Sequence, residues 1–202
     1  MKITAIKQQE RLKGRYSIFV EDKYAFSLSA DTLLEEKLHS GQELDAAQLK
    51  NYKKLSADDK AYNLTLAYVA RRIRSQWELE DYFRRKSYDE ELSRQILAKL
   101  DKLGFVDDAK FAQAWVNNRR LLKPVSKRRL TQELRQKRIA DEIIEHVLAE
   151  DETDERDVLR ELIERKRKQT KYQDNLKLMQ YLAGQGFNYG DIKQALEAPE
   201  DD

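Results

Sequence analysis

The sequence predicts a mainly α-helical protein of three tandem three-helix repeats, preceded by a small N-terminal β-sheet. Charged residues make up 38% of the 202 positions, whereas Gly and Pro number only 6 and 2. That balance is typical of helices with solvated charged faces and does not fit collagen-like or Pro/Gly-rich chains. After residue 55 most of the chain has helical periodicity, and this part repeats itself. The 40% hydrophobic content is enough for a packed core.

Residues 1–55 differ from the rest because they are rich in aromatic and β-branched residues. The ranges 2–9, 15–20 and 24–29 predict three strands, with Glu21-Asp22-Lys23 as the tight turn between the last two. Two short helices are predicted after the strands, over 31–38 and 45–54, and the first ends at Gly41. We therefore expect a small antiparallel sheet with short helices.

Helix starts and stops are marked along residues 56–202. Three Ser residues are each followed three positions later by an acid, the pattern of a capping box: Ser56 and Asp59, Ser75 and Glu78, and Ser87 and Glu90. The other signals, in order, are a left-handed end at Gly104, a start at Asp107 or Asp108, a break at Pro124, a start at Ser126 or Pro124, and an end at Gly184 with Gly186. These signals divide the region into short helices.

The helical region matches itself at offsets of 51 and then 48 residues. The apolar pair of the second helix recurs as Leu79 and Phe83, Leu130 and Leu134, and Leu178 and Leu182. We predict an N-terminal segment over 1–55 and three repeats over 56–106, 107–149 and 150–202. One such repeat cannot bury its apolar stripe alone, so the repeats are expected to stack into an elongated curved array. Such arrays usually bind a long partner, although a scaffold role fits the same pattern.

Catalytic chemistry has little support in the sequence. The chain has no Cys, which excludes disulfides, thiolate nucleophiles and Cys-based metal sites. Its two His residues, His39 and His146, lie far apart, and neither a Gly-rich phosphate loop nor a nucleophile elbow occurs. We expect no enzyme activity, no metal and no cofactor. Since no apolar run approaches the roughly 20 residues of a membrane span, we expect a cytoplasmic protein without a membrane partner.

Basic residues recur where the first helix of each repeat ends. The three corners hold Arg71, Arg72 and Arg74; then Arg119, Arg120, Lys123, Lys127, Arg128 and Arg129; then Arg165, Lys166, Arg167, Lys168 and Lys171. Residues 119–138 contain nine Lys or Arg and one acid, Glu133. Stacked repeats would align these corners into a basic strip, and a concentrated positive field attracts phosphate or an acidic protein surface.

The same cations have an ordinary structural explanation. Cations near a helix C-terminus complement its dipole by about 0.3–1 kcal/mol, and charge runs often form only a solvated face. Three corners in register favour a binding role. On the helix predicted from Ser126 to Lys137, Arg128 and Arg135 share a solvent-directed face opposite Leu130 and Leu134. The aromatic spacing, at Trp115 for example, is typical of core, which leaves base stacking as the minor alternative.

A set of motifs in residues 60–150 is typical of one protein family. The motifs are Arg72-Ile-Arg74-Ser75-Gln-Trp-Glu78-Leu79 followed by Lys86; Leu103-Gly104-Phe-Val-Asp107-Asp108 followed by Phe111, Ala112, Trp115 and Arg119; and Glu133-Leu134 with Lys137. Together they resemble the RecX family of bacterial recombinase regulators. Residues 150–198 are similar to a third, weaker repeat of that family, and the N-terminal segment is compatible with it.

The resemblance implies a protein without catalytic activity that binds the RecA recombinase filament on single-stranded DNA. Such a protein limits filament growth or promotes disassembly, which restrains strand exchange and the co-protease activity of RecA. Direct binding of single-stranded and double-stranded DNA is also implied. An autonomous DNA-binding helical-repeat protein that needs no recombinase is the alternative. We expect a monomer whose contact residues are Arg71, Arg72, Arg74, Arg119, Arg120, Lys123, Lys127, Arg128, Arg129, Arg135 and Lys137.

The chain departs from the family pattern at one turn of each of the first two repeats. Where the family commonly has Gly after the Lys of the second repeat, this chain has Arg138, and Ser87 stands at the equivalent position of the first. We expect Ser87 to act as an N-cap and Arg138 to add a surface charge.

Overall fold

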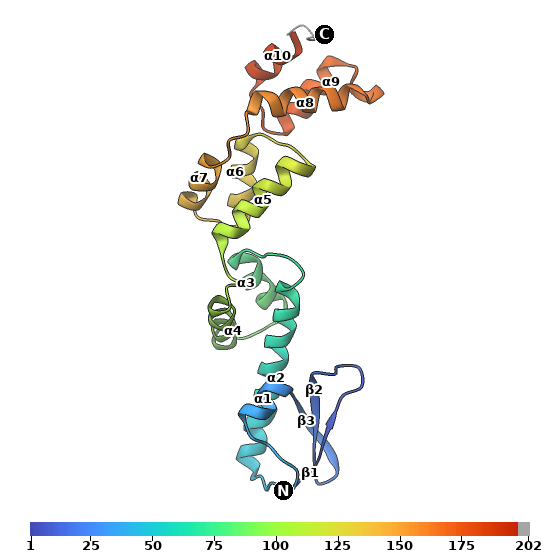
Figure 1. The fold of residues 1–202 in the computed structure, drawn as a ribbon, viewed down its shortest axis with the longest axis vertical. Coiled ribbons are helices and arrows are strands. Elements are labelled where there is room, and N and C mark those ends of the chain that lie inside the picture. The colour runs from blue at the N-terminus through green and yellow to red at the C-terminus, as the bar shows by residue number, and fades with distance from the viewer. Residues whose placement is uncertain (198–202) are drawn as a thin grey trace. The chain divides into compact units, whose positions relative to one another are not determined.

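The computed structural model describes residues 1–197 as three strands, ten α-helices and one short 3-10 helix (Figure 1). The chain divides into two compact parts, which we call the N-terminal and C-terminal parts. The N-terminal part consists of Met1–Arg72 with Phe83–Leu100, and the C-terminal part consists of Ile73–Tyr82 with the residues from 101 onward. The predicted end of the third repeat, at residue 202, lies outside the described residues.

The N-terminal part contains the predicted antiparallel sheet, with strand order β1-β2-β3. The strands are β1 Ile3–Gln8, β2 Arg15–Val20 and β3 Lys23–Ser29. Glu21 and Asp22 form the turn between β2 and β3 with φ values of 50° and 61°. Two consecutive left-handed residues twist a hairpin in the sense that its strands prefer. The sheet buries Ile3, Ile18 and Leu28 completely.

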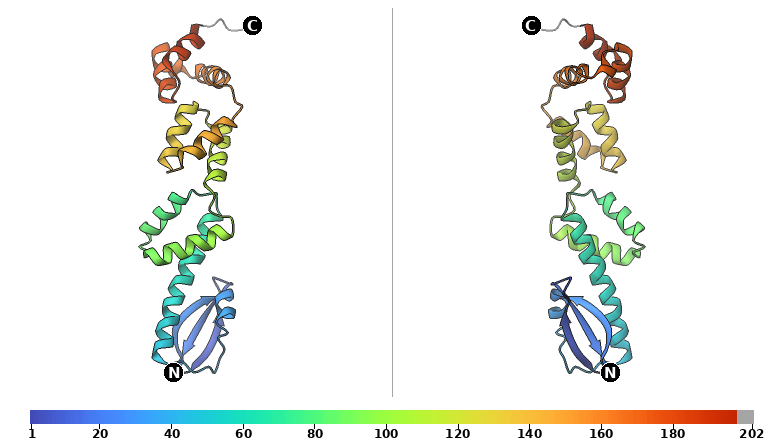
Figure 2. Two further views of the ribbon diagram at one scale, coloured as in Figure 1. Left: turned by 90° about the vertical axis from the view of Figure 1, so that its left-hand side faces the viewer. Right: turned by 90° about the vertical axis from the view of Figure 1, so that its right-hand side faces the viewer.

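The predicted helix start at Ser56 is wrong, because α2 continues through this position. After α1 (Ala30–Glu35), α2 runs without interruption from Ala46 to Val69, and Figure 2 shows it lying along the sheet. Ser56 and Asp59 therefore lie inside a helix and do not cap one. No Gly or Pro interrupts the backbone hydrogen bonding of residues 46–69, so the local Ser and Asp pattern does not end the helix.

Asp59 and Ser56 instead bind the sheet. The Asp59 carboxylate accepts from Arg15 Nη1 at 2.7 Å and from Ser29 Oγ at 2.6 Å. The Ser56 hydroxyl donates to the backbone carbonyl of Ser27 over 2.6 Å. The Asp59 side chain is 3% exposed, and a carboxylate this buried needs a charged partner and several donors. These polar contacts fix α2 against the sheet.

The remaining helices follow the predicted three-helix pattern. After α2 come α3 (Gln76–Arg85) and α4 (Glu90–Lys102), and repeat 2 consists of α5 (Asp108–Leu122), α6 (Lys127–Gln136) and α7 (Asp141–Ala149). Repeat 3 consists of α8 (Glu155–Arg167), the 3-10 helix Thr170–Tyr172, α9 (Asn175–Gly184) and α10 (Tyr189–Glu197). The predicted caps at Ser75, Asp107 and Ser126 are confirmed, since each accepts from the backbone N–H three residues later.

The second helix of every repeat ends in the same left-handed turn. Ser87, Arg138 and Gly186 have φ values of 54°, 58° and 92° and occupy equivalent positions. In each turn the next residue donates its backbone N–H across the turn, as Ile139 does to the carbonyl of Leu134 at 3.2 Å. The prediction that Ser87 caps α4 was wrong. Asp89 accepts from the backbone N–H of Leu92 at 2.8 Å, whereas Ser87 takes the turn position that favours Gly.

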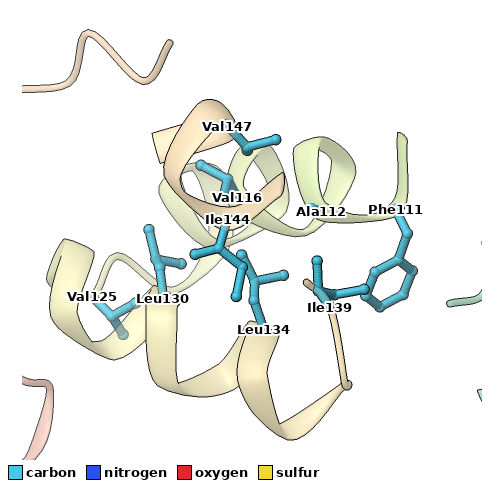
Figure 3. Close-up of a cluster of buried hydrophobic side chains, with 9 residues drawn as sticks. All are labelled: Phe111, Ala112, Val116, Val125, Leu130, Leu134, Ile139, Ile144 and Val147. Carbon is cyan, nitrogen blue, oxygen red and sulfur yellow. The ribbon is translucent and has the colours of Figure 1, made fainter. Parts of the chain in front are cut away.

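The apolar pairs predicted as core are confirmed. Leu79, Phe83, Leu130 and Leu134 are all at most 2% exposed. Figure 3 shows side chains from α5, α6 and α7 filling one space in repeat 2, with Leu130 and Leu134 among them. Repeat 3 has its own core of Val158, Leu159, Leu162, Ile163, Leu178, Leu182, Phe187 and Ile192.

Candidate functional site

A pocket of about 350 Å³ lies where repeats 2 and 3 meet, within the C-terminal part. We call it the inter-repeat pocket. Five cationic side chains and one carboxylate line it, so four positive charges are uncompensated there. The lining residues are Arg119, Lys123, Pro124, Val125, Arg129, Glu133, Arg165, Lys166, Gln169, Tyr181 and Gln185.

The pocket is positive because cations from two helix ends converge on it. Arg119 stands in the last turn of α5, and Arg165 and Lys166 stand in the last turn of α8. Each complements the partial negative charge of its own helix C-terminus. Arg129 enters from the first turns of α6, the helix that begins after the break at Pro124. The second and third predicted basic corners are thus brought together here.

Glu133 holds two of these arginines in place. Its carboxylate accepts from Arg119 Nε at 2.8 Å and Arg119 Nη2 at 3.0 Å, and Arg129 Nε lies 3.5 Å away. Trp115 Nε1 also donates to it over 2.9 Å. The Glu133 side chain is only 9% exposed, which a carboxylate tolerates because every donor points at it. Arg119 and Arg129 are therefore oriented before any partner arrives.

Among the cations of the pocket, Lys123 and Arg165 are the least engaged in contacts within the protein. Both are exposed, and within residues 1–197 no ion pair joins either of them to an acid. Lys166 is half-buried and lies 4.6 Å from the ring centre of Tyr181. The ammonium and guanidinium groups of Lys123 and Arg165 can accordingly meet an external anion without first breaking a contact.

Two other predicted contact residues hold repeats 2 and 3 together. Arg120 donates to Asp151 Oδ2 from Nη2 at 2.7 Å, and the two side chains are 12% and 6% exposed. Lys127 Nζ donates to the carbonyl of Asp151 at 2.8 Å. Burial raises the pKa of Asp151, but hydrogen bonds from Thr153 and Arg120 outweigh it, so that the pKa lies below its usual range. Arg120 and Lys127 are thus engaged inside the protein.

The remaining predicted residues are spread over both parts. Lys137 Nζ donates to Glu78 Oε1 at 2.7 Å, and exposed Arg135 donates to Asp141 Oδ1 at 2.7 Å. Arg128 is exposed on α6, as the sequence predicts. Arg71 and Arg72 are exposed in the N-terminal part and half-buried Arg74 belongs to the C-terminal part, so a strip uniting all three corners stays a prediction.

The joints between repeats contain contacts that the sequence did not reveal. The backbone N–H of Ser126 donates to the carbonyl of Gln185 at 3.2 Å, where repeat 3 meets the start of α6. A Cβ on the neighbouring Gly186 would lie 2.9 Å from Arg129 Cβ and 3.1 Å from the Arg129 amide nitrogen. The available signal was Gly186, which the sequence identifies only as a helix end.

Aromatic faces near the pocket are already in contact with cations. Arg119 and Lys137 each lie 5.4 Å from the ring centre of Trp115. Lys166 lies over both Tyr172 and Tyr181. The rings pack against these cations, which weakens the minor alternative of base stacking at these side chains.

The described part of the chain offers neither a metal-binding cluster nor a membrane-spanning helix. Within residues 1–197, no group of three or more His, Cys, Asp or Glu side chains is placed to hold a metal ion. His146 is exposed and lies 3.4 Å from the carboxylate of Glu150. No helix in this range has the length and apolar composition needed to cross a bilayer.

Four family models match consecutive stretches of the chain. They are described as the regulatory protein RecX N-terminal domain, over residues 1–45, and the first, second and third three-helix domains of RecX, over 61–100, 107–148 and 153–196. The matched three-helix stretches contain the left-handed turns at Ser87, Arg138 and Gly186. The models therefore divide the helical region in the same order as its internal repeats.

Individual proteins are similar in the same way. Proteins described as Regulatory protein RecX from Lactobacillus johnsonii and Oceanobacillus iheyensis are 37% and 36% identical over 116 and 123 residues, which are 57% and 58% of this chain. The match spans less than half of those relatives, 42% and 45% of their length. A crystal structure described as regulatory protein RecX has a TM-score of 0.70 at 28% identity and covers 98% of this chain and 99% of the other. The structure of RecX from Lactobacillus salivarius has a TM-score of 0.56 at 25% identity, over 69% and 94%. With its N-terminal domain and all three helical domains matched, the chain belongs to the RecX family of regulatory proteins.

Proposed function

We propose that this protein binds the RecA filament on single-stranded DNA and lowers its recombination and co-protease activities. Family membership supports a regulatory role without catalysis of its own. The observation that carries the proposal is the inter-repeat pocket, where five cations face one carboxylate. A nucleoprotein filament presents regularly spaced phosphates, and a positive pocket on a repeat protein is suited to such a partner. The filament forms in the cytoplasm, where the protein would act.

All of the predicted contact residues except Arg74 divide into three groups under this proposal. Lys123, Arg128 and Arg135 are exposed and meet the partner, together with the exposed pair Arg71 and Arg72. Arg120, Lys127 and Lys137 bond to groups of the neighbouring repeats and keep the binding surface in shape. Arg119 and Arg129 line the pocket while Glu133 orients them. Losing the first group is expected to cost binding and not folding.

Binding to the filament, compared with binding to naked DNA, tests the proposal. Labelled protein is titrated with oligothymidylate that is either naked or coated with RecA and a slowly hydrolysed ATP analogue, across a salt series. Tighter binding to the coated oligonucleotide at every salt concentration is expected. Absence of binding to the coated form, with the protein folded by circular dichroism, rejects the proposal.

The second candidate function is autonomous DNA binding without a recombinase. The uncompensated charge of the pocket favours it, because phosphate binding needs cations and little else. In the same titration this candidate requires naked oligonucleotide to bind as tightly as the coated form, and RecA to compete for DNA instead of recruiting the protein. The preference between the two forms therefore decides between the candidates.

A further inference from the structure

We propose that the inter-repeat pocket is a backbone-phosphate site for single-stranded nucleic acid, which reads no base and clamps repeat 3 onto repeat 2 when it is occupied. This inference rests on the proposed function and assigns its DNA contact to one place. The pocket is formed by both repeats: Arg119, Lys123 and Arg129 belong to repeat 2, and Arg165 and Lys166 belong to repeat 3. One phosphate between them is attracted by cations on both sides of the joint.

The size of the pocket suits a phosphodiester group. Its volume of about 350 Å³ is at the low end of ordinary small-ligand sites, which run from roughly 300 to 1,000 Å³. A phosphate with its flanking sugars fits this space, whereas a helix or strand of a partner protein does not. Guanidinium groups are well suited to phosphate oxygens, and Glu133 holds Arg119 by two hydrogen bonds while Arg129 Nε lies 3.5 Å from the same carboxylate.

The lining favours phosphate over an acidic protein segment. Tight protein contacts depend on apolar or aromatic residues that enter fitted apolar pockets. Here the apolar lining is limited to Pro124, Val125 and Tyr181. Val125 is 2% exposed and Tyr181 lies against the Lys166 ammonium, so neither offers an open apolar surface. Charge alone remains for recognition, and charge alone is what a phosphate backbone needs.

The same features predict that the site ignores base identity. Tyr181, which lines it, and Trp115, which donates to the lining residue Glu133, are already in contact with cations. Base reading requires free ring faces or groups that match the base edges, and the pocket's two amides, Gln169 and Gln185, are few against five cations. Oligonucleotides of different bases should therefore bind alike.

Clamping follows from where the pocket sits. The joint is closed by the Ser126 amide donating to the Gln185 carbonyl, with the Gly186 backbone against Arg129. Gln185 also lines the pocket. An anion shared by Lys123 of repeat 2 and Arg165 of repeat 3 offsets the repulsion between these like charges. Occupancy therefore stabilises the closed joint and slows exchange of the Ser126 amide proton.

The test is the affinity of naked, labelled oligothymidylate for the full chain, measured by fluorescence anisotropy across a salt series. The variant is Lys123→Gln with Arg165→Gln, because both residues are exposed and neither bonds to Glu133. The control is Lys53→Gln with Lys60→Gln, which removes the same charge from exposed positions of α2. Each lost contact to a single strand is expected to reduce the slope of log K against log salt by about 0.7. The pocket variant should thus lose about 1.4 in slope and about tenfold in affinity at low salt, whereas the control stays within about twofold.

Several results would overturn the inference. The first is a pocket variant that binds oligothymidylate with wild-type affinity, and the second is an equal loss of affinity in the Lys53→Gln/Lys60→Gln control. The third is tighter binding of oligothymidylate than of oligocytidylate of equal length. The fourth is a rate of Ser126 amide exchange that bound oligothymidylate does not slow. Poly-glutamate that competes as well as oligothymidylate at equal charge would reassign the pocket to an acidic protein segment. A pocket variant that loses naked DNA and binds the RecA filament severalfold more weakly supports this site and leaves the proposed function standing. A wild-type chain that binds naked DNA through the pocket but ignores the filament refutes the proposed function alone.

Discussion

The backbone N–H of Gln76 donates to the carboxylate of Asp108 over 2.8 Å, and this bond links the first turn of α3 to the first turn of α5. The next joint repeats the arrangement, since the backbone N–H of Lys127 donates to Glu155 Oε1 at 2.7 Å. In both cases an acid that begins one repeat satisfies an amide at the start of the second helix of the repeat before it. Helix N-termini leave such amides without intrahelical partners. Successive repeats are therefore joined by a shared cap.

Two replacements of Asp108 are expected to separate the effect of its charge from the effect of its hydrogen bond to the Gln76 amide. Burial raises the pKa of Asp108, and the hydrogen bond from Gln76 compensates only in part. The charged form is thus penalised at neutral pH, and this group's contribution to stability falls as the pH rises through its folded pKa. Asp108→Asn keeps an acceptor and removes the charge, so it should change the free energy of unfolding by less than about 0.5 kcal/mol. Asp108→Ala removes the cap and should cost about 1 kcal/mol.

Urea unfolding of the two Asp108 variants at pH 7 checks this expectation. Glu161→Ala is the control, because Glu161 is an exposed acid in the middle of α8. Equal losses in Asp108→Asn and Asp108→Ala would show that the charge, and not the cap, is what matters.

Gly186 should be the least replaceable glycine of the chain. Gly186→Ala introduces a Cβ at φ 92° that meets Ser126 Oγ and Arg129. Left-handed strain and overpacking together should cost about 2–4 kcal/mol. Gly184→Ala is the matched control two residues earlier, at the last residue of α9 and with nothing within 4 Å of an added Cβ, and should gain about 0.5 kcal/mol. Thermal unfolding separates them, and similar melting temperatures for both variants would disprove the close packing at the joint.

Replacing Arg138 with glycine should stabilise the protein. It stands at φ 58° in the turn that Gly186 occupies in repeat 3. A side chain in the left-handed region costs about 1 kcal/mol, and glycine also lowers stability through the unfolded state, so Arg138→Gly should gain about 0.5 kcal/mol. Arg135→Gly, inside α6, should lose about 1 kcal/mol. The midpoints of urea unfolding measure both changes. A lower midpoint for Arg138→Gly than for the wild type would contradict left-handed strain at Arg138.

Asp151 should make the C-terminal part sensitive to acid. Its folded pKa is lowered, so the stability that it contributes is present above the unfolded value near 3.9 and is lost as the pH falls through the folded pKa. Asp151→Ala should cost about 2 kcal/mol at pH 7, because it leaves the Arg120 guanidinium buried without its partner. Stability measured from pH 7 down to pH 2 should fall less steeply in the variant. Parallel curves would contradict the pairing.

Helix ends are predicted correctly where the cap depends only on neighbouring residues. The prediction fails at Ser56 and Asp59, whose partners are distant in the sequence. Gly104, Asp107 and Ser126 were identified because a cap needs only its own few residues. Ser56 and Asp59 were misassigned because the groups that bind them belong to the sheet, and Arg15 stands 44 positions before Asp59.

Charge pairing also depends on residues that are distant in the sequence. Residues 119–138 contain a single acid, which suggests uncompensated charge. Arg120 and Lys137 nevertheless find carboxylates 31 and 59 positions away, at Asp151 and Glu78. Only the fold can supply such pairs. The convergence of Lys123 with Arg165 depends on the angle between two repeats, which sequence periodicity does not encode.

The rate of ATP hydrolysis by RecA on single-stranded DNA, measured as this protein is added, tests the regulatory role most directly. We predict that wild-type protein and the Lys53→Gln/Lys60→Gln control lower the rate to the same extent. The Lys123→Gln/Arg165→Gln variant should need a severalfold higher concentration for the same effect. A rate that stays constant with saturating wild-type protein would contradict the proposed regulation of the filament.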